Sequence, residues 1–495
     1  MLIANRELPV GARGAPRRAA WLAVVLVAGL VAGLVCGCAS YTTRLGDLRA
    51  KVARGELEAA LARVTGETNP GEVLYHLERG LLLRLGRDYP ASNEELGAAE
   101  IRIEDLYTIS LSERVLTFLV DDEQEAYRGE IFEANYLHFY RMLNFFAMDE
   151  RASAVVEARR LALRLTRVRD EESDPYQGDD PFLHYVTGVI LESAGEWNAA
   201  LIAYRRAGEV WGDAARSGGG PPPAWLSRDL QRAADRAGIT LDALVFDEMG
   251  LSTPPRAAAD GERGGSLLLL FESGWVPHKV SEHVRVPIFS NDSQGRDHEG
   301  ALALGRTLGD RYRFHRRHGS WAPAPVEIDY FIDAAIPLLV EESAAEVVAC
   351  TWRLAPTEPG LLPRGGAPPE GTTMVLDDLA QRTRKAFEAQ WPGRLARTFA
   401  RALLKYVATR QAERGIGSWA GVLANLTGVA TEKADTRSWL LLPAEIQVSR
   451  IELPAGDYRL TMDARDREGR SLERRELTVS VALGGVTVVS WRALE

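Results

Sequence analysis

A recurring pattern of small and aromatic residues constrains the N-terminal half of this 495-residue chain more than any other feature. From about residue 41 to residue 246, apolar side chains recur at i, i+3 and i+4, the spacing of one face of an α-helix. Within this stretch, Gly188 is followed at fixed offsets by Trp197, Ala200, Tyr204 and Ala207. Small residues at such offsets let two antiparallel helices approach closely, and an aromatic ring fills the groove between them. The pattern therefore predicts pairs of packed helices.

The same offsets occur upstream, which indicates a repeat. One copy begins at Gly80, and weaker copies run through Met142 and Gly55. A helical hairpin that recurs about every 34 residues is the tetratricopeptide arrangement, in which hairpins stack into a curved solenoid because none can bury its apolar face alone. The expected helix-contact residues are Gly80, Tyr89, Ser92 and Ala99 in one copy, and Gly188, Trp197, Ala200, Tyr204 and Ala207 in the other. The uneven spacing between copies leaves an irregular helical bundle as the alternative.

The second half of the chain changes its period. Residues 266–271 form an apolar run with the length of a buried strand. Further strands are predicted at 282–289, 326–340, 346–354, 444–452, 458–464, 477–481 and 486–491, with a long helix over 377–413 in which Pro392 is an expected interruption. We therefore expect a multidomain chain. An N-terminal all-α, tetratricopeptide-like domain spans 38–251, a Pro/Gly/Ala-rich linker spans 252–265, and an α+β, β-rich domain with inserted helices spans 266–495.

The N-terminus has the pattern of an export signal. A basic lead with Arg13, Arg17 and Arg18 precedes an uncharged apolar run at 19–35, and the run leads into Val35-Cys36-Gly37-Cys38. Val-x-Gly-Cys resembles the lipobox of bacterial lipoproteins. The resemblance implies that residues 1–37 are removed as a signal peptide and that Cys38 carries the lipid. Cys36 fits this motif less well. An uncleaved anchor helix is the alternative, although about 17 apolar residues is at the short end for spanning a bilayer.

The residues that follow Cys38 indicate in which membrane the protein is held. Ala39 and Ser40 follow the proposed lipidation site, where an Asp would retain many lipoproteins at the inner membrane. The resemblance thus implies an outer-membrane lipoprotein that faces the periplasm.

The chain carries 59 basic and 69 acidic side chains, a net charge of −10. An acidic surface disfavours nucleic acid, because phosphates must be neutralised by Lys and Arg.

The sequence contains no phosphate-binding loop of the Walker type, no dinucleotide fingerprint, no His-Glu-x-x-His motif and no nucleophile elbow. His315 and His318 are three residues apart, but arginines surround them, so a solvated loop is favoured over a metal site. Cys350 lies in an apolar run and is interpreted as a buried small hydrophobe. The segment Asp435-Thr436-Arg437-Ser438-Trp439 is interpreted as a braced turn. The uncharged stretch 415–430 is a buried loop-helix, or alternatively a contact with a membrane surface or a partner.

The order of these features resembles a poorly characterised family of bacterial lipoproteins with an N-terminal tetratricopeptide-like region and a C-terminal β-rich domain. The resemblance rests on three segments: Tyr89-Pro90-Ala91-Ser92, Val156-Glu157-Ala158-Arg159-Arg160, and Ala434 to Trp439 with Leu442-Pro443 following. It implies a lipid-anchored envelope scaffold that binds other envelope proteins, small lipoproteins among them, without catalytic, cofactor or metal residues. The alternatives are an enzyme acting on cell-wall glycan and a surface structural or adhesin-like protein.

Overall fold

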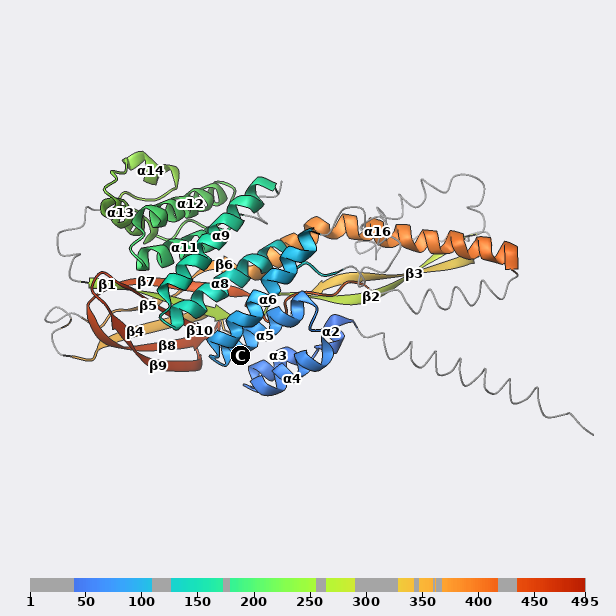
Figure 1. Ribbon diagram of the computed structural model, residues 1–495, viewed down its shortest axis with the longest axis horizontal. Helices are drawn as coiled ribbons and strands as arrows, with labels where there is room; N and C mark the ends of the chain where they lie inside the picture. The colour runs from blue at the N-terminus through green and yellow to red at the C-terminus, as the bar shows by residue number, and fades with distance from the viewer. Residues whose placement is uncertain are drawn as a thin grey trace, which may run out of the picture. The chain divides into compact units, whose positions relative to one another are not determined.

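The computed structural model describes residues 40–108, 126–171, 179–254, 264–289, 328–341, 347–358, 361, 367–416 and 434–494 (Figure 1). The chain groups into two compact units. The larger unit, called the body below, comprises Leu45–Val280, Pro337–Leu395 and Thr436–Glu495. The smaller unit comprises Met1–Arg44, Ser281–Ile336 and Ala396–Asp435. Each unit is described by itself.

The described residues of the N-terminal part of the body form a series of helices, as the sequence predicts. Its helices are α3 (Leu48–Ala53), α4 (Leu57–Glu67), α5 (Val73–Leu85), α6 (Tyr89–Thr108), α8 (Ile131–Ala147), α9 (Arg151–Glu171), α11 (Pro181–Ser193), α12 (Trp197–Arg216), α13 (Leu226–Ala237) and α14 (Ala243–Glu248). Three hairpins, α5/α6, α8/α9 and α11/α12, pack against one another in chain order. We call α5, α8 and α11 the first helices of their hairpins, and α6, α9 and α12 the second helices.

Close approach of the paired helices depends on glycine. A Cβ atom added to Gly188 of α11 would lie 2.6 Å from two ring carbons of Tyr204 on α12, and one added to Gly80 of α5 would lie 2.7 Å from Leu96 on α6. The Ser92 hydroxyl of α6 donates to the carbonyl of Gly80 at 2.7 Å, which ties these two backbones together. The small residues therefore occupy the helix contacts, and the paired-helix fold class is confirmed.

Two four-stranded sheets follow in the body. One has the order β10-β1-β7-β6 and the other has the order β5-β4-β8-β9. Their strands are β1 (Gly264–Ser273), β4 (Ala349–Pro356), β5 (Glu370–Thr372), β6 (Met374–Asp378), β7 (Glu445–Pro454), β8 (Gly456–Arg465), β9 (Ser471–Val481) and β10 (Val486–Arg492). All these pairs are antiparallel except β1 with β10, which are parallel. The first and last strands of the β-rich region are thus neighbours.

Strand β1 is buried on both faces, because the sheet that contains it is covered on both sides. Leu267, Leu269 and Phe271 point toward the second sheet and form a core with residues such as Tyr458 and Leu460 of β8. The alternate side chains of β1 point the other way, where Glu272 accepts a hydrogen bond from Tyr140 of α8. The body is therefore layered as helices, sheet and sheet (Figure 1).

Helix α16 (Leu379–Ile416) and the two-stranded sheet of β2 (His278–Phe289) and β3 (Ile328–Val340) each have residues in both units. The expected interruption at Pro392 is wrong, since α16 continues through it. Both Pro392 and Glu388, whose carbonyl loses its intrahelical donor, are exposed, so water can hydrogen-bond to that carbonyl. The smaller unit also contains α2 (Tyr41–Arg44).

Two further expectations concern the chain as a whole. The domain boundary at 252–265 stays a prediction, and residues 255–263 of it lie outside the described residues. Helices on one side of that boundary and strands on the other belong to the same body. Among the described residues, no helix combines the length and the apolar character that crossing a membrane requires.

Gly188→Ala tests the helix contact. Alanine normally favours a helix interior over glycine by about 1 kcal/mol. Here its methyl group would overlap the ring of Tyr204, whose hydroxyl is fixed by a hydrogen bond to Glu192, so the ring cannot turn away freely. Overpacking of this kind costs roughly 1–3 kcal/mol. We expect the thermal unfolding midpoint of the full chain to fall.

The matched control is Gly66→Ala on α4. Nothing lies within 4 Å of a Cβ atom at that position, and the residue is exposed. The same substitution there should leave the unfolding midpoint unchanged or raise it. A Gly188→Ala protein as stable as the Gly66→Ala protein would show that α11 and α12 do not meet at Gly188.

Candidate functional site

A buried loop at residues 436–442 lies between the helices and the first sheet of the body. It precedes β7 and carries the segment that the sequence analysis interprets as a braced turn. Thr436, Trp439, Leu441 and Leu442 have no solvent exposure at all. The backbone of such a loop must find hydrogen-bond partners within the protein, because an unpaired buried N–H group is costly. We call residues 436–442 the central loop.

Two glutamates on the first helices accept the backbone N–H groups of the central loop. Glu78 of α5 accepts from Leu440 at 2.6 Å with one carboxylate oxygen and from Leu441 at 3.2 Å with the other. Glu133 of α8 accepts from Trp439 at 2.8 Å. Both glutamates are buried. These side-chain oxygens satisfy three backbone N–H groups that have no access to water, so α5 and α8 hold the loop by its main chain.

A buried arginine from the start of the body holds the other side of the central loop. Arg49 of α3 donates to the carbonyl of Leu440 at 2.9 Å and to that of Val276, which follows β1, at 2.7 Å. Its guanidinium also lies 5.6 Å from the centre of the Trp275 ring, and Arg492 of β10 lies 4.4 Å from the same ring. Helix α3 is therefore joined directly to the first sheet and to the central loop.

Burial dominates the electrostatics of the two glutamates. It raises the pKa of Glu78 from its usual 4.5 to about 8, although the two backbone N–H groups and the Arg49 guanidinium oppose the shift. Burial also raises the pKa of Glu133, and the negative charge of nearby Glu130 adds to that effect. Glu78 therefore changes its protonation close to neutral pH.

Glu130 behaves in the opposite way. Burial acts to raise its pKa, but Lys279, Arg394 and Gln390 outweigh that effect and lower the pKa to about 2. The ammonium group of Lys279 lies 3.0 Å from the Glu130 carboxylate and also donates to the carbonyl of Arg437 at 3.1 Å. Glu130 is the N-cap of α8, so this cluster joins the start of α8 to α16, to β2 and to the central loop.

A second polar contact joins α8 and α11 to the edge of the first sheet. Tyr136 of α8 donates to Asp377 of β6, and Arg382 of α16 lies 2.6 Å from Asp377 and 3.0 Å from Asp180. Asp180 is the N-cap of α11 and accepts the N–H of Phe182 at 2.9 Å. Burial raises the pKa of Asp180 to about 7, and Asp377 adds to the shift while Arg382 opposes it.

A third polar contact centres on Arg450 of β7. Its guanidinium lies 2.8 Å from Glu192 of α11 and 3.7 Å from Asp229 of α13. Arg232 of α13 also pairs with Glu192, at 3.0 Å, and the hydroxyl of Tyr185 donates to Asp229 at 2.9 Å. Each first helix of the three hairpins therefore makes buried polar contacts with the chain's own C-terminal half.

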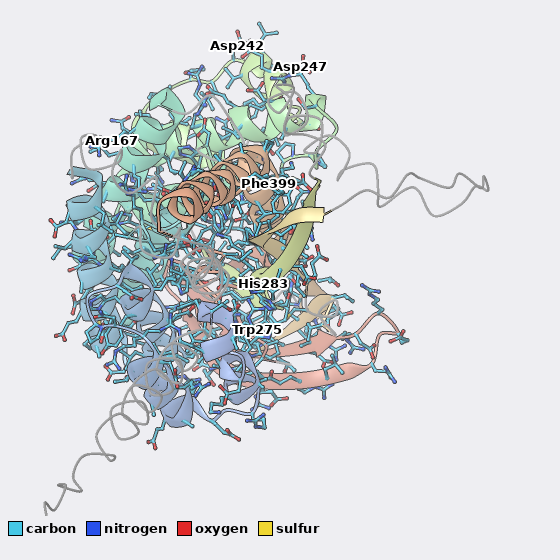
Figure 2. The ribbon with its side chains drawn as sticks, turned by 90° about the vertical axis from the view of Figure 1, so that its right-hand side faces the viewer. Arg167, Asp242, Asp247, Trp275, His283 and Phe399 are labelled. Carbon is cyan, nitrogen blue, oxygen red and sulfur yellow. The ribbon has the colours of Figure 1, made fainter. Side chains whose placement is uncertain are left out.

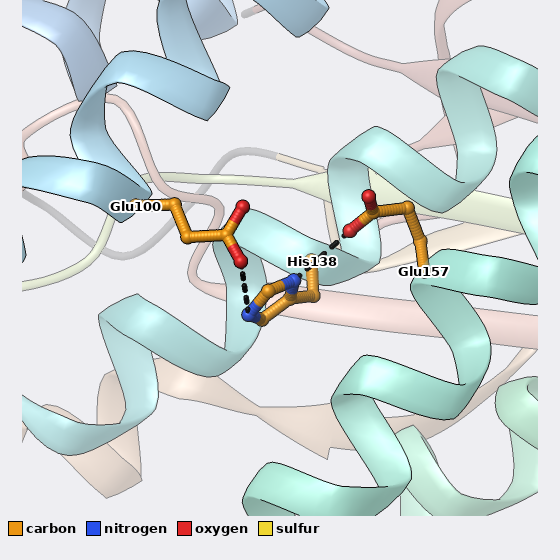
Figure 3. Close-up of side chains that lie close together, drawn as sticks. All are labelled: Glu100, His138 and Glu157. Atoms are coloured by element: carbon orange, nitrogen blue, oxygen red, sulfur yellow. Dashed lines mark hydrogen bonds and ion pairs between the residues drawn. The ribbon is translucent and has the colours of Figure 1, made fainter. Parts of the chain in front are cut away.

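One cluster in the helices has the composition of a metal site. The imidazole of His138 lies 3.0 Å from Glu157 and 3.9 Å from Glu100, and these three side chains come from α8, α9 and α6 (Figure 3). Arg141 pairs with both carboxylates, 3.1 Å from Glu157, and Arg160 lies 3.3 Å from Glu100. These guanidinium groups already neutralise the carboxylates, so the cluster is suited to bracing three helices rather than to holding a cation.

The structure places every predicted repeat residue at or near a helix contact. Ala99, Ala200, Tyr204 and Ala207 are completely buried, as is Ser92. Tyr89 and Trp197 are half-buried at the starts of second helices, where the guanidinium groups of Arg84 and Arg236 stack on their rings. At Gly80 and Gly188, an added Cβ atom would overlap a side chain of the partner helix.

The second helix of each hairpin (α6, α9 and α12) exposes large apolar side chains to solvent. They are Ile101 on α6 (63% exposed), Val156 and Leu163 on α9 (47% and 68%) and Ile202 on α12 (70%). The first helices, in contrast, carry none of the exposed large apolar side chains of the described residues. The outer side of the hairpins is thus the side with free apolar surface.

Several predicted features lie outside the described residues. These are Cys38 with the signal segment, the His315 and His318 cluster, and residues 417–430 of the uncharged stretch. Cys350 is described, and its interpretation as a buried small hydrophobe is confirmed. It is completely buried in the core between the two sheets, and burial raises its pKa to about 12.

Sequence reasoning missed Glu78 and Glu133 as loop-holding residues. Glu78 stands among Leu74, Leu77, Leu81 and Leu82, on the apolar face of α5, and a carboxylate on such a face signals a specific buried partner. The spacing of apolar residues cannot identify the group that Glu78 binds, because Leu440 lies 362 residues further along the chain.

Comparison with known protein families, with characterised proteins and with solved structures finds no match to this chain. The arrangement itself, paired helices followed by a β-rich region, is shown by the structure. The site is therefore interpreted from its own geometry.

The raised pKa of Glu78 predicts a pH dependence. In the unfolded chain this carboxyl loses its proton near pH 4.5, whereas in the body it keeps the proton up to about pH 8. Between these values the folded state binds the extra proton, so the free energy of unfolding should fall as pH rises, by at most about 1.4 kcal/mol per pH unit from this group. Above pH 8 its contribution should be constant.

Glu78→Gln removes this titration. We expect the difference in unfolding free energy between wild type and Glu78→Gln to shift in favour of the variant as pH rises from 5 to 8, measured by denaturant unfolding of the full chain. Glu94→Gln, at an exposed position on α6, is the control and should track the wild type at each pH. A difference between wild type and Glu78→Gln that is independent of pH would contradict the assignment.

Proposed function

We propose that this chain is a lipid-anchored scaffold of the bacterial cell envelope, held at the outer membrane through Cys38 and facing the periplasm, that binds other envelope proteins through its helical hairpins. The lipobox at residues 35–38 supports the anchor. The run of paired helices supports the binding role, since stacked hairpins present extended surfaces to partners. The proposal assigns no catalytic residue, cofactor or metal.

One observation decides which surface of the hairpins is proposed to bind. The first helices, which line the binding groove in many repeat proteins, are covered here by the chain's own sheet and central loop. Glu78, Glu133 and Glu192 all bond to that C-terminal half. The second helices instead expose Ile101, Leu163 and other large apolar side chains to solvent. We therefore assign partner binding to the outer side of α6, α9 and α12.

The class of partner follows from the resemblance described in the sequence analysis. Small envelope lipoproteins are the proposed partners, because the lipoproteins that this chain resembles are associated with them. Exposed apolar side chains flanked by paired charges, such as Leu163 near Arg160, suit the core and rim of a protein interface. Nucleic acid is not proposed as a partner of a chain with net charge −10.

Cys38→Ser tests the anchor. The variant should lose metabolic labelling by a fatty acid and accumulate as a larger precursor, because the lipobox cysteine is both the lipid acceptor and the residue after the cut. Cys36→Ser is the matched control and should be labelled and processed like wild type. Since each buried CH₂ contributes about 0.8 kcal/mol to membrane binding, the wild-type protein should also resist extraction by high salt. Normal processing of Cys38→Ser would rule out Cys38 as the acceptor.

Leu163→Asp tests the binding surface. A charge on the outer side of α9 should remove those envelope proteins that copurify with the tagged full chain from detergent-solubilised membranes, identified by mass spectrometry. Leu483→Asp is the control, because Leu483 is nearly as exposed (64% against 68%) but lies in the turn between β9 and β10. If both variants retain the same partners as wild type, the outer side of α9 is not the binding surface.

A further inference from the structure

The most exposed apolar side chain of α9 lies among arginines. Leu163 is 68% exposed. Arg159 and Arg160 precede it by four and three residues, and Arg167 follows it by four, so all three lie beside it on the helix surface. These arginines are exposed, whereas α9 exposes no acidic side chain up to Arg167, the part of the helix whose side chains the structure describes. We call Leu163 with these three arginines the basic patch.

The arginines of the basic patch keep donors free for a partner. Arg159 lies 2.7 Å from Glu196 and Arg160 lies 3.3 Å from Glu100, yet both arginine side chains remain at least half exposed. Arg167 forms no ion pair with any residue that the structure describes. Because a guanidinium group has five N–H donors, one carboxylate does not saturate it. The patch can therefore bind further carboxylates.

Helix α14 and the turn before it carry the opposite pattern. Leu244 is 64% exposed, and Ile239 nearby is 42% exposed. Asp242, the N-cap of α14, precedes Leu244 by two residues, and Asp247 and Glu248 follow it by three and four. All three acidic residues are exposed. We call Ile239 and Leu244 with these three acidic residues the acidic patch.

The carboxylates of the acidic patch have no cation beside them. Residues 237–250 include no Lys, Arg or His. None of the three carboxylates forms an ion pair with another residue of the described ranges. The patch therefore presents apolar side chains with an unbalanced negative rim.

Both patches belong to firmly packed elements of the body. Met249, which follows α14, is buried against Gly208 and Gly212 of α12. Helix α12 packs on α11, and α11 packs on α9. Figure 2 shows Arg167 on one part of the surface, well apart from Asp242 and Asp247. The two patches are each exposed, so they do not cover one another within one chain.

We propose that the basic patch of one copy binds the acidic patch of a second copy of this chain. Each patch has an exposed leucine at its centre and three charges around it, and the charges have opposite signs. An apolar centre with a complementary charged rim is the arrangement of a protein interface. Contact between two basic patches would instead bring arginines together. The inference rests on the proposed use of the outer side of α9 for binding, and it names one occupant of that side.

The geometry of this contact lets association continue. The two patches are different surfaces of one chain, so a copy that has bound through one patch still offers the other. Such a head-to-tail interface builds open chains, or rings where the rotation between copies closes. The patches contain few side chains and should bury less than the roughly 1,200 Å² of stable complexes, so each contact is weak in solution.

Cysteine crosslinking captures weak contacts and tests their direction. Thr166→Cys places a thiol one turn after Leu163, and Ala243→Cys places one beside Leu244; both positions are exposed, and all charges of the patches are kept. The full chain, purified in excess detergent, is treated with a flexible bis-maleimide. We expect the double variant to give dimers, trimers and larger species. A mixture of the two single variants should give dimers only, and each single variant alone should give monomers.

Two controls show whether the patches cause the crosslinking. A variant with Thr166→Cys and Leu483→Cys should give no ladder, because Leu483 is as exposed as Leu244 but lies in the turn between β9 and β10. Wild-type protein reports any reaction of the chain's own cysteines, of which Cys350 is completely buried.

Disrupting either patch should weaken the ladder. Leu163→Asp or Asp247→Arg, added to the double-cysteine variant, should reduce the crosslinked fraction several-fold without changing the thermal unfolding midpoint. About 1 M salt should do the same, because it shortens the Debye length to roughly 3 Å.

Three results would overturn the inference. They are dimers of the Thr166→Cys variant alone, which would show that α9 binds α9, a ladder that Leu163→Asp leaves unchanged, and the absence of a ladder. The last result, together with loss of copurifying envelope proteins in Leu163→Asp, would leave the proposed function standing and exclude only the second copy. A ladder from a protein whose Leu163→Asp variant keeps its envelope partners would support the inference and place those partners elsewhere.

Discussion

The capture of main-chain N–H groups by buried carboxylates is the interaction on which the rest of the body depends. Glu78 and Glu133 stand on two different hairpins, yet their oxygens meet three consecutive residues of one loop. That loop leads directly into β7, which lies beside β1 in the first sheet. The position of the loop thus sets the position of the sheet against the helices. Loss of one carboxylate would leave buried donors without acceptors, which costs more than a hydrogen bond contributes.

Several buried polar and charged contacts lie between the helices and the first sheet. Glu272, Arg450 and Asp377 all lie on the helix-facing side of the first sheet, and each meets a charged or hydroxyl group from the helical layer. Buried ion pairs add little net stability, because desolvation offsets the attraction between the charges. Such pairs do penalise any other alignment of the two layers. In this protein they select one register of helices on sheet, and so fix which side of each hairpin faces away from the sheet.

The sequence predicts more of the fold than of the candidate site. Helical spacing and small residues such as Gly188 and Ala200 indicate paired helices, and the apolar run at 266–271 indicates a strand covered on both faces, because both signals are local. The parallel pairing of β1 with β10 has no local signal. The same is true of the loop-holding role of Glu78, although a carboxylate among leucines marks it as unusual. The sequence indicates a braced turn at 435–439, but the residues that hold this segment, Glu78 and Glu133, lie on helices more than 300 residues away.

The position of β10 has a consequence for how the chain matures. A polypeptide chain is synthesised from its N-terminus onward, so the hairpins can form first from contacts between near neighbours in sequence. The carboxylates of Glu78 and Glu133 then await a loop that emerges some 300 residues later, and β1 awaits a strand that ends at Arg492. Contacts between distant segments form slowly, since closing long loops has an entropic cost. The half-emerged chain is therefore an open intermediate with uncovered helices, and the body closes only when its last strand arrives.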